Sequence, residues 1–564
     1  MNKIISRILI LILFLLCTFL SVSMFANKKD DYAGIIEECR TLIPEVMTKE
    51  KIPGLSIAIV DKNKTIWADG FGFSDMDHKK PITANTIFGI MSISKTITAT
   101  AIMMAVQDGL VDLDQPIANY LPGFTINSRF EDNPETKITL KHLLSCTAGL
   151  GYEAPVGNGY DYPKLSSFEE HIQSISDTWL RYPVGQRFCY STLGIDLAGY
   201  ILQVKSGKTF NSYVKQKLLN PLRMTNSSFD IETIKRNHNR AVGHDFDYSH
   251  VPLEMPMIPS GGFYTSVSDL AKFVRLHLNE GRINGKSLLN KETLNIMYRI
   301  PFPIEGQFEG YALGISKNWS YYYNTNFYNH SGSGFGFKTN MVWNPEYQVG
   351  LIILTNNGNH NILGNLTIQI IDKIIMMKGG PRKYQQINVE NKNKALNQVD
   401  LPSLKQFAGN YLGRNEQLSV TIDPDVSFRF NEGNPELVRF ISLDECILGN
   451  YYYRFVSTHQ TPAYIIRVSD GYNWIYNDGP SDQPGLDKKE WEKYLGEYEL
   501  IKWGQKHLKL KVFRKNGYLY AGNYFQYKLH EYQPGLFFSS TGVSVEFKGD
   551  KCIFGSLGWD KIVK

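Results

Sequence analysis

Hydrophobic and polar positions divide the chain into an apolar start, a mixed region, a polar stretch and a region of alternating residues. From about 31 to 378, helical and strand periodicities are mixed with many glycine-rich turns, which is typical of a domain that contains both. Residues 379–402 are polar and lack apolar periodicity, which predicts a linker. From 403 to 564, short runs such as LSVTI, YYYRFV and LKLKVF alternate with Gly, Asn and Asp, which predicts an all-β region.

The all-β region contains a weak internal repeat. The pentamer FAGNY at 407–411 is echoed by YLGEY at 494–498, and each precedes a run of alternating residues. The repeat predicts two similar units, 403–485 and 488–564, each of about eighty residues. They are expected to form either two small barrels or the two halves of one.

The first residues have the layout of an export signal over 1–26. Two cations, Lys3 and Arg7, precede an apolar run from Ile8 to about Leu20, and small residues end near Ala26. We therefore expect a secreted, periplasmic or otherwise extracytoplasmic protein. The alternative is an uncleaved membrane anchor, because the run approaches the ~20 residues that a span needs. That segment would be the chain's contact with a membrane.

Composition and charge narrow the class of protein. A chain of 564 residues exceeds one ordinary core, so two or three domains are expected. The 43% hydrophobic fraction fits a folded protein, and a net charge of +5 without a basic cluster argues against a nucleic-acid partner. The cysteines beyond the signal are odd in number and scattered, which fits neither a disulfide framework nor a zinc site. They are Cys39, Cys146, Cys189, Cys446 and Cys552. No motif indicates a metal or another cofactor.

A candidate nucleophile lies at the start of an apolar helical stretch, in the sequence MSISKTITATAIMMAV. Residues three apart share one face of a helix, so Ser92 and Lys95 are expected to lie one turn apart. A hydroxyl at the positive end of a helix dipole is well placed for developing negative charge. Because serine needs a nearby base, a desolvated lysine amine is a suitable partner.

The same S-x-x-K spacing recurs at Ser212 and Lys215, within FNSYVKQKLLNPLRM. That copy follows an amphipathic helix pattern, without a glycine-rich turn before it or an apolar helix after it. We interpret it as part of a solvated helix face. The surrounding sequence, rather than the four-residue pattern, therefore selects Ser92.

The sequence around Ser92 resembles the serine β-lactamase and penicillin-binding-protein superfamily, and in particular its class C β-lactamase-like branch with esterase and D-aminopeptidase relatives. The resemblance is colinear over most of residues 31 to 376. The segments that carry it are, in order, MSISK, DGLVDLDQPIANYLPGF, ITLKHLLSCTAGL, PVGQRFCYSTLGIDLAGYIL, NPLRMTNSSF, PSGGFYTSVSDLAKF and NHSGSGFGF. It implies an α+β fold, with an antiparallel sheet flanked by helices and a helical subdomain. The C-terminal region resembles the lipocalin-like β-barrels of some D-aminopeptidase relatives.

The resemblance implies that three motifs carry the chemistry. They are Ser92 with Lys95, then Tyr190-Ser191-Thr192, and then His330-Ser331-Gly332. The implied reaction is two-step acyl transfer, in which Ser92 loses its proton to Lys95 or Tyr190 and attacks a carbonyl carbon.

Further roles follow from the same resemblance. The backbone N–H groups of Ser92 and Ser333 are expected to bind the oxyanion. His330 is expected to support Tyr190 or to contact the leaving group. Gly332 is expected to let a strand lie close to the substrate, because a side chain would fill the cleft. Ser94 either caps the helix or holds the lysine amine.

Thr192 stands where the family usually has Asn, whose amide binds the acyl-amide group of a β-lactam or peptide. Together with His330 in place of the usual Lys, it argues against an efficient β-lactamase. We expect a hydrolase of esters or D-amino-acid amide or peptide bonds, acting on a small molecule, a peptide or cell-wall fragments. The alternatives are a D-alanyl-D-alanine carboxypeptidase or weak β-lactamase, and a penicillin-binding or cell-wall-binding sensor without turnover.

Overall fold

The computed structural model describes residues 32–380 and 405–562, with gaps. In the first range the gaps are 158–165, 245–252, 304–306 and 321–322. In the second they are 413–416, 423–425, 432, 441–443, 450, 457–463, 469–471, 478–487, 503–505, 524–525 and 540. The predicted signal, and all but the first two residues of the predicted linker, lie outside the described residues. Within them, no helix is both long and apolar enough to cross a membrane.

The N-terminal domain is built on an antiparallel sheet, for which eight strands are described. In spatial order these are β3 (Lys80–Pro81), β2 (Thr65–Asp75), β1 (Gly54–Asp61), β12 (Val349–Thr355), β11 (Phe337–Asn344), β10 (Thr325–Gly334), β9 (Ser316–Ser320) and β8 (Gly310–Tyr311). The first and last long strands of the domain meet at its centre, where Leu55 pairs with Thr355. This pairing joins the beginning and the end of the N-terminal domain in one sheet, ahead of the β region in the chain.

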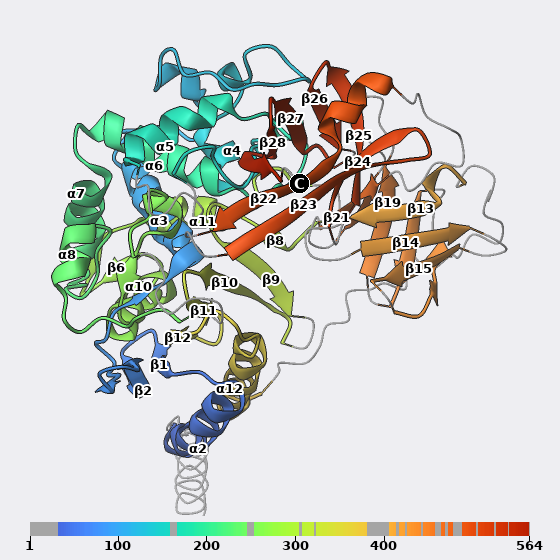
Figure 1. Cartoon of the computed structure of the whole chain (residues 1–564). Coiled ribbons are helices and arrows are strands. Elements are labelled where there is room, and N and C mark those ends of the chain that lie inside the picture. Colours follow the sequence, from blue (N-terminus) through green and yellow to red (C-terminus); the bar gives the residue numbers. More distant parts are fainter. Residues whose placement is uncertain are drawn as a thin grey trace, which may run out of the picture.

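Side chains of β12 alternate between two hydrophobic cores. Val349, Leu351 and Ile353 face a core shared with α2 (Ala33–Lys49) and α12 (Leu363–Met377). Ile352 and Leu354 face the opposite core, which contains α10 (Val267–Leu278) and the helical subdomain. Because both faces are covered, every residue of β12 is buried. Figure 1 shows α2 and α12 lying together below the sheet.

The helical subdomain surrounds α3 (Ser94–Gln107), whose residues from Ser94 to Ala105 are all buried. Its other helices are α4 (Leu140–Leu144), α5 (Phe168–Ser174), α6 (Thr192–Ser206), α7 (Phe210–Val214), α8 (Ile231–Arg236), α9 (Ile258–Gly261) and α11 (Lys291–Met297). Two short strand pairs accompany them, β4 (Phe88–Gly89) with β5 (Tyr264–Thr265) and β6 (Arg282–Ile283) with β7 (Lys286–Ser287). A helix buried on all sides places its first turn inside the protein, where the candidate nucleophile lies.

The β region consists of two separate antiparallel sheets. The first has nine described strands in the order β16 (Glu436–Leu437), β15 (Val426–Phe430), β14 (Gln417–Ile422), β13 (Gly409–Leu412), β21 (Asn473–Asn477), β20 (Tyr464–Arg467), β19 (Tyr451–Val456), β18 (Glu445–Leu448) and β17 (Arg439–Phe440). Its two edge strands, β16 and β17, are separated in the chain by Val438 alone, so the sheet must curl to bring its edges together.

The second sheet is a closed barrel. Its described strands are β22 (Gly496–Lys502), β23 (Lys506–Lys515), β24 (Tyr518–Gly522), β25 (Gln526–Gln533), β26 (Leu536–Ser539), β27 (Ser544–Lys548), β28 (Lys551–Phe554) and β29 (Leu557–Lys561). The last strand pairs with the first, with Tyr498 opposite Lys561. Closure removes the unpaired edges that an open sheet exposes.

The two pentamers of the repeat adopt the same local structure. The Tyr411 hydroxyl donates a 2.7 Å hydrogen bond to the Phe407 carbonyl, and the Tyr498 hydroxyl donates one of 2.8 Å to the Tyr494 carbonyl. The glycine between them has a φ of 140° in the first unit and 142° in the second. Each pentamer therefore leads from a 3-10 turn into the first strand of its sheet, β13 or β22.

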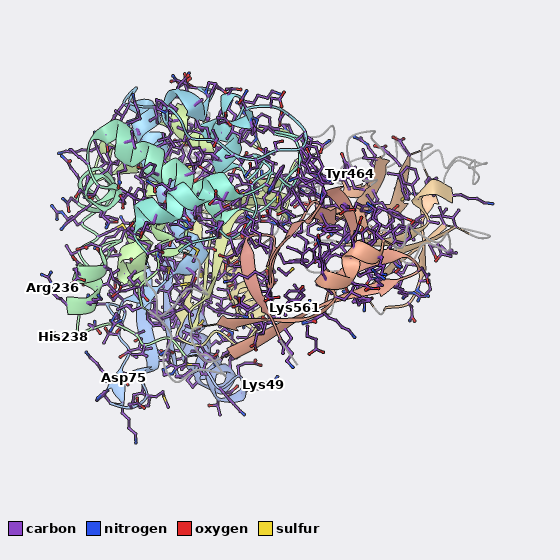
Figure 2. The ribbon with its side chains drawn as sticks, turned by 45° about the horizontal axis from the view of Figure 1, so that its top comes forward. Lys49, Asp75, Arg236, His238, Tyr464 and Lys561 are labelled. Atoms are coloured by element: carbon purple, nitrogen blue, oxygen red, sulfur yellow. The ribbon has the colours of Figure 1, made fainter. Side chains whose placement is uncertain are left out.

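Both β units contact the segment that leads to Tyr190. The Arg187 guanidinium lies between two rings, 4.0 Å from the centroid of Tyr182 and 4.5 Å from that of Tyr464 in β20. The Tyr182 hydroxyl also donates a 2.9 Å hydrogen bond to the carbonyl of Thr541 in the barrel. Tyr464, labelled in Figure 2, lies at this border between the helices and the first β sheet.

Candidate active site

Ser92 and Lys95 lie at the start of the central helix. Ser92 is in a 3-10 turn, Met91–Ile93, that runs directly into α3. Met91 before it has a φ of 48°, a left-handed conformation that is uncommon for a residue with a side chain. The Lys95 side chain is 1% exposed, and its Nζ donates hydrogen bonds to Ser92 Oγ (3.1 Å) and to the Ser260 carbonyl (3.0 Å). A desolvated amine therefore contacts the serine hydroxyl directly.

Tyr190 precedes α6 and lies beside this pair. Its ring centroid is 5.0 Å from Lys95 Nζ and stacks at 6.0 Å on the ring of Tyr152. The next residue, Ser191, is the N-cap of α6, where its Oγ accepts from the Gly194 N–H. The cap fixes the start of the helix and thereby the backbone at Tyr190.

His330 comes from β10, on the opposite wall. Its Nδ1 lies 2.7 Å from the Ser331 carbonyl oxygen, which can only accept, so Nδ1 carries a proton. In the neutral ring, Nε2 then accepts from the hydroxyl of Tyr311, at 3.0 Å. The His330 and Tyr190 ring centroids are 6.4 Å apart.

Gly332 lies where β10 comes close to the backbone just before Ser92. A Cβ there would lie 2.1 Å from the Ile90 carbonyl oxygen and 2.5 Å from Thr339 Oγ1. The glycine thus lets β10 approach the backbone just before Ser92, and its expected closeness to substrate stays a prediction. Thr339 Oγ1 donates to the same carbonyl at 3.0 Å, which ties β11 to this segment as well.

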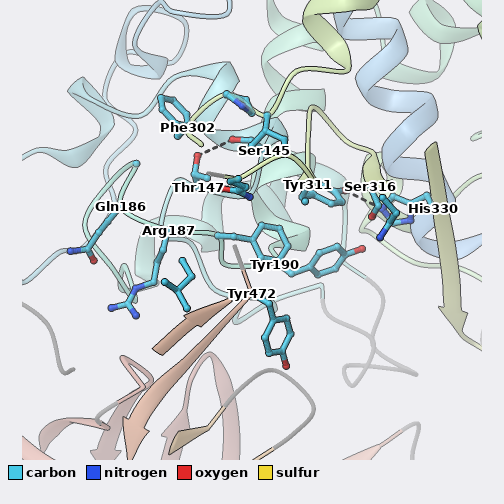
Figure 3. Close-up of a pocket in the computed structure, with 18 of the residues that line it drawn as sticks. Ser145, Thr147, Gln186, Arg187, Tyr190, Phe302, Tyr311, Ser316, His330 and Tyr472 are labelled. Carbon is cyan, nitrogen blue, oxygen red and sulfur yellow. Dashed lines mark hydrogen bonds between the residues drawn. The ribbon is translucent and has the colours of Figure 1, made fainter. Parts of the chain in front are cut away.

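A cavity of about 370 Å³ brings the three motifs together (Figure 3). Among the residues that line it are Ser92, Tyr190, His330 and Ser333. Lys95 and Thr192 line an adjoining cavity of about 200 Å³, which also includes Ser92 and Ser333. The predicted site residues therefore meet around Ser92, although they come from α3, the start of α6 and β10.

Ser94 and Thr192 are both buried next to this site. The Ser94 hydroxyl accepts a 3.1 Å hydrogen bond from the Phe263 N–H, which joins α3 to the segment after α9. The helix has no side-chain cap bond at its start. Thr192 is the first residue of α6 and is 4% exposed.

Several residues of the site have no motif that could have identified them. Tyr152 lines both cavities, and its partial burial raises the pKa of its hydroxyl while the Lys95 charge lowers it. Tyr311, the partner of His330, is 19 residues away in the chain. Tyr464, Ile466 and Tyr472 of the β region also line the larger cavity, and Figure 3 labels Tyr472 on the same side as the β strands. Only the folded chain brings these residues together.

No metal site occurs among the described residues: no group of three or more His, Cys, Asp or Glu side chains there could hold an ion. The five described cysteines are buried, and no two of them form a disulfide. The arrangement thus supplies a hydroxyl, an amine, a phenol and an imidazole around one cavity. These are the groups of nucleophilic acyl transfer.

The sequence model of the Beta-lactamase family matches residues 39–364, more than half of the chain. The chain therefore belongs to the Beta-lactamase family. This family, which is related to the penicillin-binding proteins, consists mostly of serine hydrolases, and the site has the groups that such chemistry needs.

Individual relatives agree with this assignment. Over 344 residues the chain is 27% identical to protein flp of Staphylococcus aureus (strain COL), which covers 60% of this chain and 66% of that protein. It is 28% identical to Beta-lactamase-like protein 2 of Dictyostelium discoideum, over 52% of this chain and 55% of that protein. The matched part thus spans less than two thirds of the length of these relatives.

Two solved structures share the fold. An octameric penicillin-binding protein homologue from Pyrococcus abyssi superposes with a TM-score of 0.52 at 24% identity, over 78% of this chain and 100% of that one. A structure of SurE with D-Leu superposes with a TM-score of 0.53 at 19% identity, over 78% and 99%.

Proposed function

We propose that this protein hydrolyses an ester or a D-amino-acid amide or peptide bond through an acyl-enzyme on Ser92. The observation that carries the proposal is the 3.1 Å contact between Lys95 Nζ and Ser92 Oγ at the cavity that Tyr190 and His330 also line. Lys95 is 1% exposed, so its amine meets the serine hydroxyl away from bulk water, which is where a base for a serine nucleophile is needed.

In the proposed mechanism, the Ser92 hydroxyl gives its proton to the base formed by Lys95 and Tyr190. Its oxygen forms a bond to the carbonyl carbon, and the C=O π electrons move onto the carbonyl oxygen, which becomes the oxyanion. The backbone N–H groups of Ser92 and Ser333 stabilise this charge, for which one donor contributes ~10²–10³ in rate. The proton passes to the leaving alcohol or amine, and water then attacks the acyl-enzyme by the same steps in reverse order.

The substrate class is inferred from two side chains and from the shape of the cavity. The Thr192 hydroxyl is shorter than an amide, which disfavours substrates that rely on a side-chain amide for binding. His330, with Nε2 3.0 Å from the Tyr311 hydroxyl, places an imidazole where the family usually has a lysine amine. The wall that Tyr464 and Tyr472 contribute to the cavity of about 370 Å³ favours short substrates, because it takes up space beside the motifs.

A second candidate is D-alanyl-D-alanine carboxypeptidase or weak β-lactamase activity, which the Beta-lactamase family match supports. A sensor that is acylated without turnover would use the same Ser92. Export by the N-terminal segment is part of the proposal, and cell-wall fragments are then accessible substrates. Mass spectrometry of the protein recovered outside the cytoplasm tests cleavage near Ala26.

The test is an activity panel with the purified protein: p-nitrophenyl esters of increasing chain length, D-amino-acid anilides, D-alanyl-D-alanine peptides and nitrocefin. We expect turnover of short esters or D-amino-acid anilides that Ser92→Ala abolishes. A stable adduct on Ser92 without turnover would identify a sensor instead. Turnover that survives in the Ser92→Ala variant would contradict the proposal.

A further inference from the structure

A buried ion pair lies next to the site but belongs to none of its motifs. His171 in α5 and Asp196 in α6 are both 0% exposed, and His171 Nε2 lies 3.0 Å from Asp196 Oδ2. The other ring nitrogen, Nδ1, lies 3.0 Å from the Val156 carbonyl oxygen, which can only accept. Burial alone lowers the pKa of His171, but the hydrogen bond and charge of Asp196 outweigh it and raise the pKa. The imidazolium form, which donates from both nitrogens, fits these contacts.

The remaining carboxylate oxygen leads toward the nucleophile. Asp196 Oδ1 accepts a 2.9 Å hydrogen bond from the backbone N–H of Ser260, in the short helix α9. The carbonyl of the same residue accepts from Lys95 Nζ at 3.0 Å, and Lys95 donates to Ser92 Oγ. Hydrogen bonds on both sides of the Ser260 backbone thus link His171 and Asp196 to Lys95 and the serine.

These contacts indicate a role for the buried His171–Asp196 pair other than stabilising the fold. Burying two charges costs several kcal/mol in desolvation, and such a pair is often no more stabilising than apolar residues of similar size. Here the Asp196 carboxylate holds the backbone N–H of Ser260, while the carbonyl of Ser260 accepts from the Lys95 amine. The α9 segment is also packed tightly on α6, because a Cβ on Gly199 would lie 2.5 Å from Pro259 Cγ. The carbonyl that receives Lys95 is therefore held from two sides.

We propose that Asp196 is a positioning residue, which orients the Ser260 carbonyl so that the Lys95 amine faces Ser92, and that His171 holds Asp196 in place and balances its charge. The inference rests on the proposed function, because it concerns the same lysine. A lone carboxylate near Lys95 would favour the ammonium form and weaken the base; the imidazolium removes this effect.

The first test compares variants at Asp196 with a matched control. Asp196→Ala removes the acceptor for Ser260 and is expected to lower kcat at least ~10-fold, with KM within about twofold. Asp196→Asn keeps an oxygen for Ser260 and an amide for a neutral His171, so it should restore kcat to within ~3-fold of the wild type. The control is Asp269→Ala: Asp269 is equally buried and accepts from the Asn226 N–H, but its carboxylate also accepts from Ser227 and Lys272 and not from Ser260.

The outcomes separate positioning from stability. If folded Asp196→Ala loses no more kcat than Asp269→Ala, the inference is wrong. If Asp196→Ala does not fold, the decision falls to Asp196→Asn, whose kcat must then stay within ~3-fold. A wild-type protein without activity or labelling at Ser92 would instead contradict the proposed function.

The second test uses the pH profile of kcat/KM, which a purely structural role would not move. The groups that face this network are Tyr190, Tyr152 and Glu153 beside Lys95, with Glu153 also acting on His171. His171→Asn leaves the Asp196 charge unbalanced, and a nearby negative charge raises the pKa of whichever group is the base. The acid limb of the profile should therefore move to higher pH. An unchanged limb, or a shift to lower pH, would overturn the role of His171.

Discussion

Two stretches of this chain have the same S-x-x-K spacing, but the fold places them in opposite environments. Ser92 and Lys95 begin a helix that is buried on all sides, and the amine is 1% exposed and bonded to the hydroxyl. Ser212 and Lys215 are both exposed, and Ser212 only takes part in the start of α7, where its N–H and Oγ contact Thr209. The comparison shows that S-x-x-K spacing places a lysine near a serine in both copies. Only burial, as at Lys95, gives the lysine the environment that a base for the serine needs.

The largest expected difference is in covalent labelling. A fluorophosphonate probe should label the wild type and Ser212→Ala equally, and Ser92→Ala should lose the label entirely. The physical reason is that only Ser92 has a desolvated amine at 3.1 Å. Mass mapping of the adduct checks this, and an adduct on Ser212 would reverse the comparison.

Removing either candidate base should lower turnover nearly as strongly as removing Ser92 lowers labelling. Lys95→Ala and Tyr190→Phe are each expected to lower turnover at least ~10²-fold, the scale of general base catalysis. Lys215→Ala, the matched change in the exposed copy, should leave turnover unchanged. Circular dichroism establishes that each variant is folded. Near-native activity in a folded Lys95→Ala variant would show that the amine is not needed.

Sequence patterns predicted those parts of the site that depend on local order. The apolar run after Ser92 indicated a buried helix, and the two pentamers indicated a repeated β structure, because both signals lie within a few residues. Gly332 was predicted to be required, but its partner is the Ile90 carbonyl, which only the folded chain brings near. The Tyr311 bond to His330, the His171–Asp196 pair and the wall formed by Tyr464 join distant segments. No single stretch of sequence encodes such contacts.

A smaller effect is expected on substrate preference, and it compares Thr192 at the start of α6 with Thr209 at the start of α7. Thr192→Asn restores the amide that the family usually presents, and should shift preference toward amide-bearing substrates by about 1–3 kcal/mol at most. Thr209→Asn is the control, because Thr209 is the N-cap of α7 beside the exposed copy and Asn is a good cap. Specificity constants for a short ester and nitrocefin measure the shift. A wild type that clearly prefers nitrocefin would contradict the preference for esters while leaving the role of Ser92 intact.

The smallest effect is expected from single hydroxyl groups next to each copy. Tyr311→Phe removes the donor to His330 Nε2, and a hydrogen bond of this kind contributes about 0.5–1.5 kcal/mol, or roughly 2–10-fold in kcat/KM. Tyr213, beside Ser212, is buried, and its hydroxyl has no hydrogen-bond partner among the described residues. Because Tyr213→Phe removes a buried polar group that makes no bond, it should leave kcat/KM unchanged and keep or slightly raise the melting temperature.

The two phenylalanine variants need the same measurements, kcat/KM for the best substrate of the panel and a thermal melt. A loss of activity in Tyr311→Phe without a loss of stability would place the Tyr311 hydroxyl in the reaction through His330. Equal behaviour of the two variants would show that the hydroxyl only fills space. The functional difference between the Ser92 and Ser212 copies would then depend on the Lys95 amine. His330 would act without a hydrogen bond from the Tyr311 hydroxyl.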